Sequence, residues 1–252
     1  MNIENEILDM TKRLKLPHIR KNFLDIAKIA HEEQYNYIDY LKELLQIEVQ
    51  RREDDAKKRR LRLAHFPEKK YLEDLRIEYL PKDAKDKLGK LKTLEFIQSG
   101  QNVILSGNAG TGKSHIAIGL GVKACMEGYK VFFTSIPSLI VQLKESKSNR
   151  TLRNFQNRFE KYDLVICDEL GYISFDKEGA ELLFTNLSLR TARKSTIITT
   201  NLSFDRWEEI FSDPVLTAAM VDRLTHKAFM INMNGNSYRL KETRDWISSF
   251  ET

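Results

Sequence analysis

One short stretch constrains this chain more than any other. Residues 107–114 read Gly-Asn-Ala-Gly-Thr-Gly-Lys-Ser and fit the pattern G-x-x-x-x-G-K-[ST]. Glycines at these places let the backbone turn so that consecutive N–H groups converge on one phosphate. An apolar run at 103–105 precedes the loop, and an amphipathic segment at 115–120 follows it. A helix starting there directs the positive end of its dipole at the loop, so the segment predicts a phosphate site.

The motif gives individual residues a chemical role. Lys113 is expected to reach the β- and γ-phosphates of a nucleotide, and the Ser114 hydroxyl to bind Mg²⁺. His115 follows the motif directly, although a packing or capping role is the simpler interpretation of this histidine. The residues predicted to bind the nucleotide are Gly107, Asn108, Ala109, Gly110, Thr111, Gly112, Lys113, Ser114 and His115.

A pair of carboxylates follows a second apolar run. Residues 164–167 form a predicted central strand, and Asp168 and Glu169 come at its carboxyl end, where open α/β sheets bind ligands. We expect Asp168 to hold Mg²⁺ and Glu169 to orient and polarise the attacking water. The sequence has no Asn-Lys-x-Asp motif for reading guanine, and a Glu directly after the Asp favours hydrolysis. ATP is therefore the predicted nucleotide, and an ATPase the predicted activity.

A third run, residues 196–200, ends in Asn201. A polar side chain at this strand end could contact the γ-phosphate or the attacking water. An asparagine capping the turn that follows explains the residue equally well. The spacing alone leaves both interpretations open.

The chain divides into three parts by composition. Residues 1–65 contain no glycine and carry apolar residues at helical spacing, which predicts helices before Pro17, at 18–32 and at 37–62. Residues 66–89 are predicted to be a charged connector. From residue 90 to 252, strands at 103–105, 131–134, 164–167, 196–200 and 229–231 alternate with helices at 114–127, 137–144, 152–162 and 178–191. That alternation predicts an α/β domain with a parallel five-stranded sheet flanked by helices.

Several classes of protein are excluded by composition. No apolar run in the 252 residues approaches the roughly 18 needed to span a bilayer, and no apolar leader is visible at the N-terminus. Cys125 and Cys167 are too few for a disulfide framework and have no zinc-site spacing. We therefore expect a cytoplasmic protein with reduced thiols and no membrane partner.

Together these motifs resemble the IstB/DnaC branch of the AAA+ P-loop ATPases. The resemblance covers nearly the whole chain and is more specific to the IstB-like transposition helpers at residues 222–226, Asp-Arg-Leu-Thr-His, and at 232–239, Asn-Met-Asn-Gly-Asn-Ser-Tyr-Arg. It implies an AAA+ domain at 90–252 without a full C-terminal lid. It also implies that 1–65 is a partner or oligomerisation domain.

The resemblance adds roles for several polar residues. It makes Asn201 the sensor of the γ-phosphate and Arg223 an arginine finger that reaches the ATP of a neighbouring subunit. Arg190 and Arg193 are weaker candidates for contacts between subunits. Because no full lid fits after the last strand, neither Arg239 nor Arg244 is assigned the role of a lid-borne sensor arginine.

Two basic clusters are candidate DNA contacts: Lys57, Lys58, Arg59 and Arg60 in one, and Lys144, Lys147, Arg150 and Arg153 in the other. Such clusters neutralise phosphates without reading sequence, although a solvated charged face explains the first equally well. The second lies where related initiators carry a DNA-lining element, so the resemblance favours DNA there. Sparse aromatic residues favour duplex over single strands.

The sequence therefore predicts a DNA-binding ATPase that forms ATP-dependent homo-oligomers, binds double-stranded target DNA and hands it to an IstA-type transposase. A DnaC-type helicase loader acting on single-stranded DNA is the alternative, because its ATPase motifs would be similar. A nucleotide-gated clamp with negligible turnover is a third hypothesis, and an intact Glu169 and Arg223 argue against it.

Overall fold

Two compact units make up the chain. The computed structural model describes residues 2–172, 174–203, 206–211 and 213–250. Unit 1 is Met1–Arg59 and unit 2 is Arg60–Thr252. The long helix α3 (Tyr37–Leu63) crosses the division. The expected end of the helical part, residue 65, lies slightly beyond this division.

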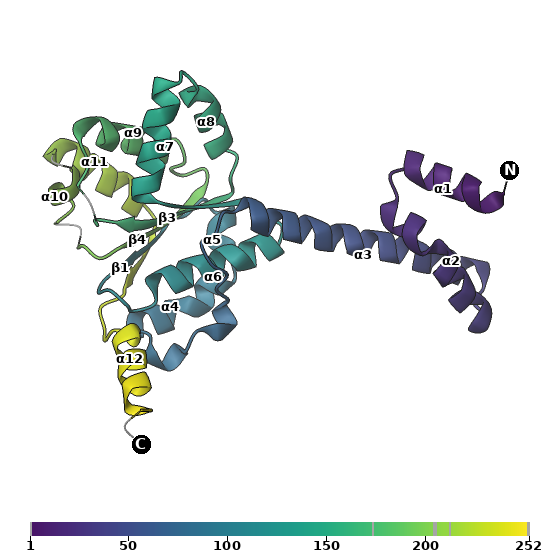
Figure 1. The fold of residues 1–252 in the computed structure, drawn as a ribbon. Coiled ribbons are helices and arrows are strands. Elements are labelled where there is room, and N and C mark those ends of the chain that lie inside the picture. The colour runs from purple at the N-terminus through teal and green to yellow at the C-terminus, as the bar shows by residue number, and fades with distance from the viewer. Residues whose placement is uncertain (1, 173, 204–205, 212, 251–252) are drawn as a thin grey trace. The chain divides into compact units, whose positions relative to one another are not determined.

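Unit 1 contains α1 (Ile3–Arg13), α2 (Pro17–Glu32) and most of α3 (Figure 1). Asn2 caps α1 by accepting a hydrogen bond from the Glu4 N–H, a group that no helical carbonyl can reach. Pro17 occupies the first turn of α2, where its missing N–H costs nothing. The helices follow the predicted ranges closely.

Glu48 of α3 is buried in unit 1 and joins α3 to α2. Its Oε2 accepts hydrogen bonds from the N–H groups of His18 (2.8 Å) and Ile19 (2.9 Å), and its Oε1 accepts one from Arg52 Nε (2.6 Å). Burial alone raises the pKa of this carboxyl, but the three hydrogen bonds outweigh burial and lower it. Glu48 thus serves as the cap of α2, although it belongs to α3.

Unit 2 is built on a five-stranded sheet in the order β2-β3-β4-β1-β5, with every neighbouring pair parallel. Its middle strand β4 pairs with β1 and β3, and the predicted parallel sheet is confirmed. The strands are β1 (Val103–Ser106), β2 (Val131–Ser135), β3 (Leu164–Leu170), β4 (Ser195–Thr200) and β5 (Phe229–Asn232).

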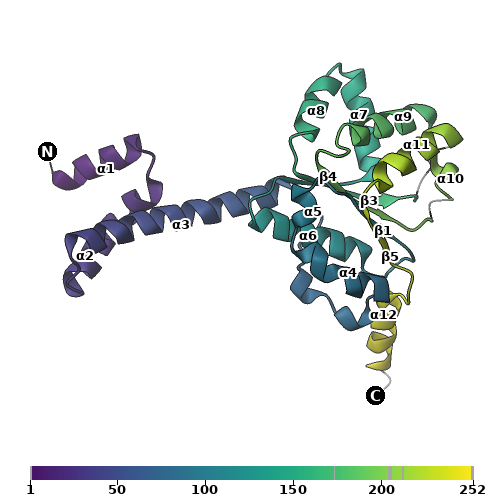
Figure 2. The same ribbon diagram turned by 180° about the vertical axis from the view of Figure 1, so that it is seen from behind.

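Helices cover both faces of the sheet, and alternate strand residues pack on opposite sides (Figures 1 and 2). Leu105 and Ile166 join one core, Ile104 and Val165 the other. The first core contains α4 (Lys82–Lys92), α5 (Glu95–Gln98) and α6 (Lys113–Met126). The second contains α7 (Ile136–Ser148), α8 (Leu152–Phe159), α9 (Lys177–Ser188), α10 (Glu208–Phe211) and α11 (Pro214–Thr225).

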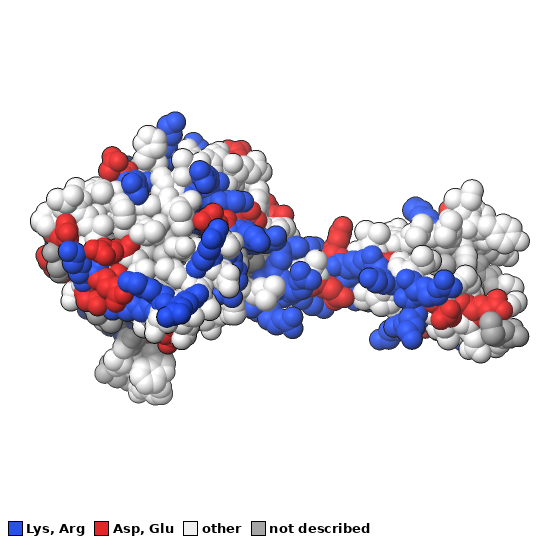
Figure 3. All heavy atoms as spheres, turned by 90° about the horizontal axis from the view of Figure 1, so that it is seen from above, with Lys and Arg blue, Asp and Glu red and all other residues white. Residues whose placement is uncertain are grey.

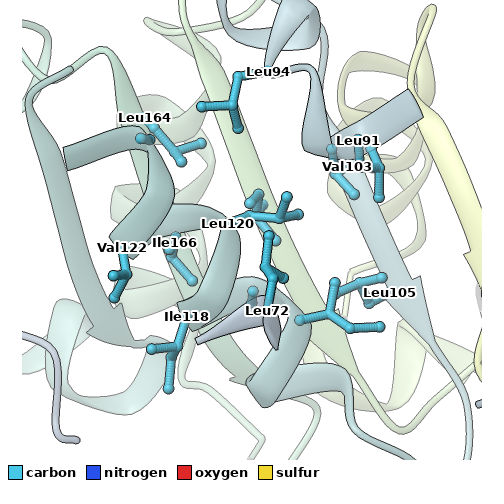
Figure 4. Packing of buried hydrophobic residues seen from close by; sticks show 14 of the residues in the cluster. Leu72, Leu91, Leu94, Val103, Leu105, Ile118, Leu120, Val122, Leu164 and Ile166 are labelled. Atoms are coloured by element: carbon cyan, nitrogen blue, oxygen red, sulfur yellow. The ribbon is translucent and has the colours of Figure 1, made fainter. Parts of the chain in front are cut away.

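The segment 66–89 is more than a connector. It forms two short 3₁₀ turns, η1 (Leu72–Asp74) and η2 (Ile77–Tyr79), and enters α4. Leu72 is buried in the same core as Leu105 and Leu120 (Figure 4). A Cβ on Gly119 would lie 2.7 Å from a Leu72 methyl carbon, so the segment packs directly on α6. Because most residues of this segment are polar or charged, its composition does not indicate that a few apolar residues anchor it in the core.

Among the described residues, five helices of unit 2 were not expected: α4, α5, α10, α11 and the C-terminal α12 (Tyr238–Ser248). Asp213 caps α11 through the N–H groups of Val215 and Leu216. Ser237 accepts from the Leu240 N–H and caps α12. Over the described residues, no helix is both long and apolar enough to cross a membrane.

Candidate nucleotide site

The glycine-rich loop lies between β1 and α6, and contacts on both sides require its glycines. Gly107 donates its N–H to the Thr200 carbonyl at 3.1 Å, and a Cβ there would lie 2.3 Å from the Met233 carbonyl carbon. Gly110 has a φ of 76°, and a Cβ there would lie 2.1 Å from Ser237 Oγ. Any larger residue at either position would displace backbone or a helix cap.

Lys113 begins α6 and is folded back over the loop. Its ammonium donates to the carbonyls of Gly107 and Asn108, each at 2.6 Å. Burial lowers the pKa of Lys113; nearby Arg239 lowers it further, while Asp168 opposes both. A cation held in this way, beside the N-terminus of α6, is placed to bind phosphate oxygens.

Ser114, Asp168 and Thr199 meet at the carboxyl ends of β3 and β4. Ser114 Oγ donates to Asp168 Oδ1 at 3.0 Å, and the Thr199 hydroxyl donates to the same oxygen. A hydroxyl and a carboxylate side by side are hard oxygen ligands that suit Mg²⁺ completed by water and phosphate. Groups of three or more His, Cys, Asp or Glu placed to hold a metal are absent from the described residues. The predicted pair, Ser114 and Asp168, therefore fits Mg²⁺ only together with a nucleotide.

Glu169 stands on a kink in β3. The pairing of β3 with β4 shifts register between Cys167 and Leu170, and Glu169 has a φ of 65°. Its N–H donates to Thr199 Oγ1 at 3.0 Å, which holds the kink. Such a bulge redirects a side chain, and a non-glycine residue in left-handed backbone is strained. Asp168 is buried while Glu169 is exposed and lines the cavity beside the loop.

That cavity has a volume of about 460 Å³ and is formed by four parts of unit 2. Loop and α6 residues 109–115 form its floor, and Glu169, Thr199 and Thr200 form the wall at the strand ends. Leu75, Tyr79 and Leu80 come from the segment expected to be a connector. Tyr238, Arg239 and Glu242 come from α12.

The sequence did not predict that the segment before α4 or the helix α12 would line this cavity. The Tyr238 N–H donates to the Gly110 carbonyl at 2.9 Å, which joins α12 to the loop. The rings of Tyr79 and Tyr238 lie 5.4 Å apart, and the Arg76 guanidinium carbon lies 5.8 Å from the centre of the Tyr238 ring. Lys241 places its ammonium 3.7 Å from the centre of the Tyr79 ring. Neither stretch, Arg-Ile-Glu-Tyr at 76–79 or Tyr-Arg-Leu-Lys at 238–241, carries a spacing pattern that places it beside the loop.

The structure separates the predicted nucleotide-binding residues into two groups. Residues 109–115 line the cavity, whereas Gly107 and Asn108 contribute the carbonyls that hold Lys113. A ring nitrogen of His115 lies 2.9 Å from the Tyr71 carbonyl oxygen, so His115 both lines the cavity and joins α6 to the segment before η1.

Asn201 and Arg223 lie outside the cavity lining of their own chain. Asn201 is exposed at the end of β4, and its Oδ1 would lie 3.2 Å from a Cβ on Gly171. Arg223 is exposed on α11 with its guanidinium carbon 4.5 Å from the centre of the Phe184 ring. An exposed arginine on a rigid helix is available to a neighbouring molecule.

Arg190, which the resemblance made a weak candidate for contacts between subunits, is a core residue instead. It is 1% exposed and donates to the carbonyls of Phe159 (2.7 Å) and Ser195 (2.9 Å). Burial lowers its pKa to about 10. Its side chain joins the ends of α8, α9 and β4, so it is not available to another subunit. Arg193 remains exposed.

The basic cluster at 144–153 is divided by its ion pairs. Lys144 binds Asp176 and Lys147 binds Glu178, each at 2.6 Å, so both lysines join α7 to the start of α9. Arg150 and Arg153 are exposed at the turn into α8. The two arginines are thus better placed for phosphates than the two lysines.

The basic cluster at 57–60 also contains residues that bind other parts of the chain. Arg60 Nε donates to the Cys125 carbonyl at 2.7 Å and joins the last turns of α3 to the end of α6. Lys58 and Arg59 are exposed, and Lys57 lies 3.9 Å from Asp54. Figure 3 shows Lys and Arg side chains crowded along α3, whereas over unit 2 they alternate with Asp and Glu.

Fold and site together define a P-loop nucleotide-binding protein of the AAA+ class. The sheet order, the loop between β1 and α6 and the Asp-Glu pair after β3 carry that assignment. Residues 9–245 match the family of IstB-like ATP binding proteins, and the chain belongs to this family. The predicted family is therefore confirmed.

Curated relatives match over almost the full chain. The protein assigned as the ATP-binding protein of insertion sequence IS21 in Pseudomonas aeruginosa is 35% identical, over 95% of this chain and 91% of its own length. Its counterpart from IS232 in Bacillus thuringiensis is 30% identical, over 91% of this chain and 92% of its own.

Solved structures of replication proteins share the fold. AMPPCP-bound DnaA from Aquifex aeolicus superposes with a TM-score of 0.56 at 19% identity, covering 73% of this chain and 56% of the DnaA chain. The DnaC helicase loader gives 0.51 at 18% identity, covering 61% and 91%. At these identities the likeness extends to the fold alone.

Proposed function

We propose that this chain hydrolyses ATP and acts as a DNA-binding helper of an insertion-sequence transposase. The observation that carries the proposal is that Lys113, Ser114 and Glu169 line one cavity, with Asp168 hydrogen-bonded to Ser114. Phosphate ligand, oxygen ligands for Mg²⁺ and general base are the groups that phosphoryl transfer to water requires.

Each residue of the site has its own role in binding and hydrolysing ATP. The loop N–H groups and Lys113 bind and orient the triphosphate, while Ser114 and Asp168 are positioned to hold Mg²⁺, which neutralises phosphate charge when bound. Glu169 accepts a hydrogen bond from the attacking water and orients it towards the γ-phosphate. We assign Asn201 to sensing that phosphate and Arg223 to the ATP of a neighbouring subunit, where its fork neutralises developing charge. Site closure then depends on ATP-driven assembly.

Relatives named for insertion sequences support the transposition role. An oligomer with exposed Arg150 and Arg153 would bind duplex DNA through its backbone and then release it to an IstA-type transposase in the cytoplasm. Another solved structure with this fold is DnaA bound to AMPPCP and single-stranded DNA, so a protein with this fold can also bind single strands. Strand preference therefore separates this proposal from the helicase loader.

The ATPase is tested by phosphate release with and without DNA. Glu169→Gln keeps the shape of the side chain but removes the base, so the rate should fall about 10²-fold or more while ATP binding persists. Glu145→Gln, on the exposed face of α7, is the matched control. A wild-type chain without DNA-stimulated phosphate release would favour the nucleotide-gated clamp.

DNA binding is tested with long duplex and single-stranded DNA at fixed salt, with ATP, a non-hydrolysable analogue or no nucleotide. Cooperative, nucleotide-dependent binding to duplex supports the helper role, and preference for single strands supports the loader. The double variant R150A/R153A should weaken binding and reduce its salt dependence. Lys144→Ala should do neither, because Lys144 is paired with Asp176.

A further inference from the structure

Strand β3 is irregular at its two acidic residues. Val165 and Cys167 pack in the second core and Ile166 packs in the first, as the alternation of side chains along a strand requires. Continued alternation would place Glu169 on the same side of the sheet as Cys167, away from α6 and the phosphate loop. Leu170 lies in that second core instead. One additional residue has therefore entered β3 between Cys167 and Leu170.

A single residue of β4 lies opposite this irregularity. The parallel register is regular up to Ile198 and resumes at Thr200. Two residues of β3, Asp168 and Glu169, therefore face the one residue between them, Thr199. Two residues opposite one form a β-bulge, which bends the strand and redirects side chains. The bulge allows Asp168 to stay buried while Glu169, the next residue, lines the cavity.

The Thr199 hydroxyl binds both residues of the bulge. It carries one proton and two lone pairs, and a carboxylate can only accept. The Thr199 proton is therefore directed to Asp168 Oδ1, which leaves a lone pair for the Glu169 N–H at 3.0 Å. Thr199 is 2% exposed, so water does not compete for either hydrogen bond. One buried hydroxyl thus fixes the side chain of one acid and the backbone of the next.

The backbone of Glu169 needs this support. Its φ of 65° lies in the left-handed region, which a residue with a side chain adopts only when surrounding contacts compensate. The hydrogen bond from its N–H to Thr199 is such a contact. Valine has nearly the same shape as threonine but offers no donor or acceptor. Position 199 therefore requires a hydroxyl as well as a β-branched shape.

We propose that Thr199 is a positioning residue for the ATPase. Its hydroxyl keeps Glu169 in the bulge, and this keeps the Glu169 carboxylate in the cavity where the attacking water is oriented. The inference rests on the proposed hydrolysis of ATP. Thr199 acts through Glu169, because its proton and a lone pair are committed to the two acids. Strand β4 thereby sets the geometry of the general base on β3.

The experiment measures phosphate release at saturating Mg²⁺ and ATP binding by calorimetric titration. Thr199→Val should lower kcat at least about tenfold, because a displacement of about 1 Å in a reacting geometry costs this much or more. Its Kd for ATP should change less than about threefold. Thr199→Ser keeps the hydroxyl and should keep most of the rate. Thr196→Val makes the same change at a buried position of the same strand, outside the cavity lining, and should match wild type.

A double variant tests whether Thr199 acts through Glu169. In Glu169→Gln the base is already absent, so adding Thr199→Val should slow hydrolysis by less than about twofold more. A residue with an independent role would lower the rate of E169Q/T199V by the full factor measured in the wild-type background. That result would overturn the proposal.

Hydrogen exchange gives a readout that does not depend on hydrolysis. The Glu169 amide should exchange at least about tenfold faster in Thr199→Val than in wild type, because its acceptor is lost. Thr196→Val should leave this rate unchanged. Circular dichroism checks that each variant is folded. If Thr199→Val does not fold, Thr199→Cys takes its place, since a thiol weakens both hydrogen bonds without removing them.

The outcomes separate this inference from the proposed function. A wild-type chain that releases no phosphate would contradict the ATPase. An unchanged exchange rate of the Glu169 amide would by itself overturn the role of Thr199. So would a wild-type kcat in Thr199→Val, whether or not ATP binding weakens. An equal loss of rate in Thr199→Ser would assign the effect to the methyl group and also overturn the proposal.

Discussion

The two units of this chain use their apolar residues in opposite ways. Unit 2 encloses its sheet between two cores, so that β1 residues such as Ile104 and Leu105 are almost fully buried. Unit 1 buries a few side chains of α2 and exposes Leu45 and its neighbours on α3. Dense internal packing fixes the geometry that phosphate chemistry requires. Unit 1 is held together by a much smaller core.

The largest expected effect contrasts two leucines. Leu105→Ala should destabilise unit 2 by about 2–5 kcal/mol, because it leaves a cavity in a core that cannot collapse around it. Leu45→Ala on α3 should change the stability of the monomer by less than about 0.5 kcal/mol. Urea denaturation at one protein concentration measures both. Equal costs would contradict the contrast between the units.

A second test concerns buried charge in unit 2. Arg190→Met keeps the volume but leaves the carbonyls of Phe159 and Ser195 without their donor, at a cost of about 2–3 kcal/mol. Exposed Arg193→Met is the matched control and should be neutral. If Arg190→Met instead abolished oligomerisation of a chain with unchanged stability, the residue would belong to an interface after all.

The Glu48 cap is the corresponding polar feature of unit 1. Glu48→Ala should cost about 1–2 kcal/mol, since it removes the acceptor from two N–H groups of α2, whereas exposed Glu43→Ala should not. Because the folded pKa of Glu48 is lowered, its contribution is complete above the ordinary glutamate pKa. It is lost as the pH falls through the lowered value. Thermal melts across acidic pH should show this loss in wild type and not in Glu48→Ala.

The smallest expected effect lies on α12, the part of unit 2 that most resembles unit 1. None of its described residues is buried, yet Arg239 lines the cavity. Arg239→Ala should weaken ATP binding about fivefold, because one exposed cation near the phosphates is lost. Arg244→Ala, on the same helix but outside the lining, should bind ATP as wild type does. Calorimetric titration with ATP would distinguish the two.

The sequence predicted those parts of the fold and site that depend on local pattern. The strand before the loop, the glycines, Lys113 and the Asp168–Glu169 pair are all visible in one linear stretch each. The five parallel strands followed from their alternation with helices, and the family from the order of the motifs.

What the sequence could not reveal depends on contacts between distant segments. Leu72 looks like an isolated apolar residue among charges until it packs on Gly119 of α6. Arg190 looks like a surface arginine until two carbonyls surround it. Tyr238 and Arg239 reach the cavity only because α12 folds back onto Gly110. The spacing of residues along the chain does not predict any of these three contacts.

Helix α6 connects the phosphate loop to Arg60 inside unit 2. Its first residue, Lys113, stands at the phosphate loop, and its far end accepts the Arg60 hydrogen bond at Cys125. Its 14 residues extend about 21 Å as one rigid rod. A tilt of about 10° at the phosphate end moves the other end by nearly 4 Å. A tilt of α6 that followed the number of phosphates in the pocket would therefore move the end of the helix that holds Arg60.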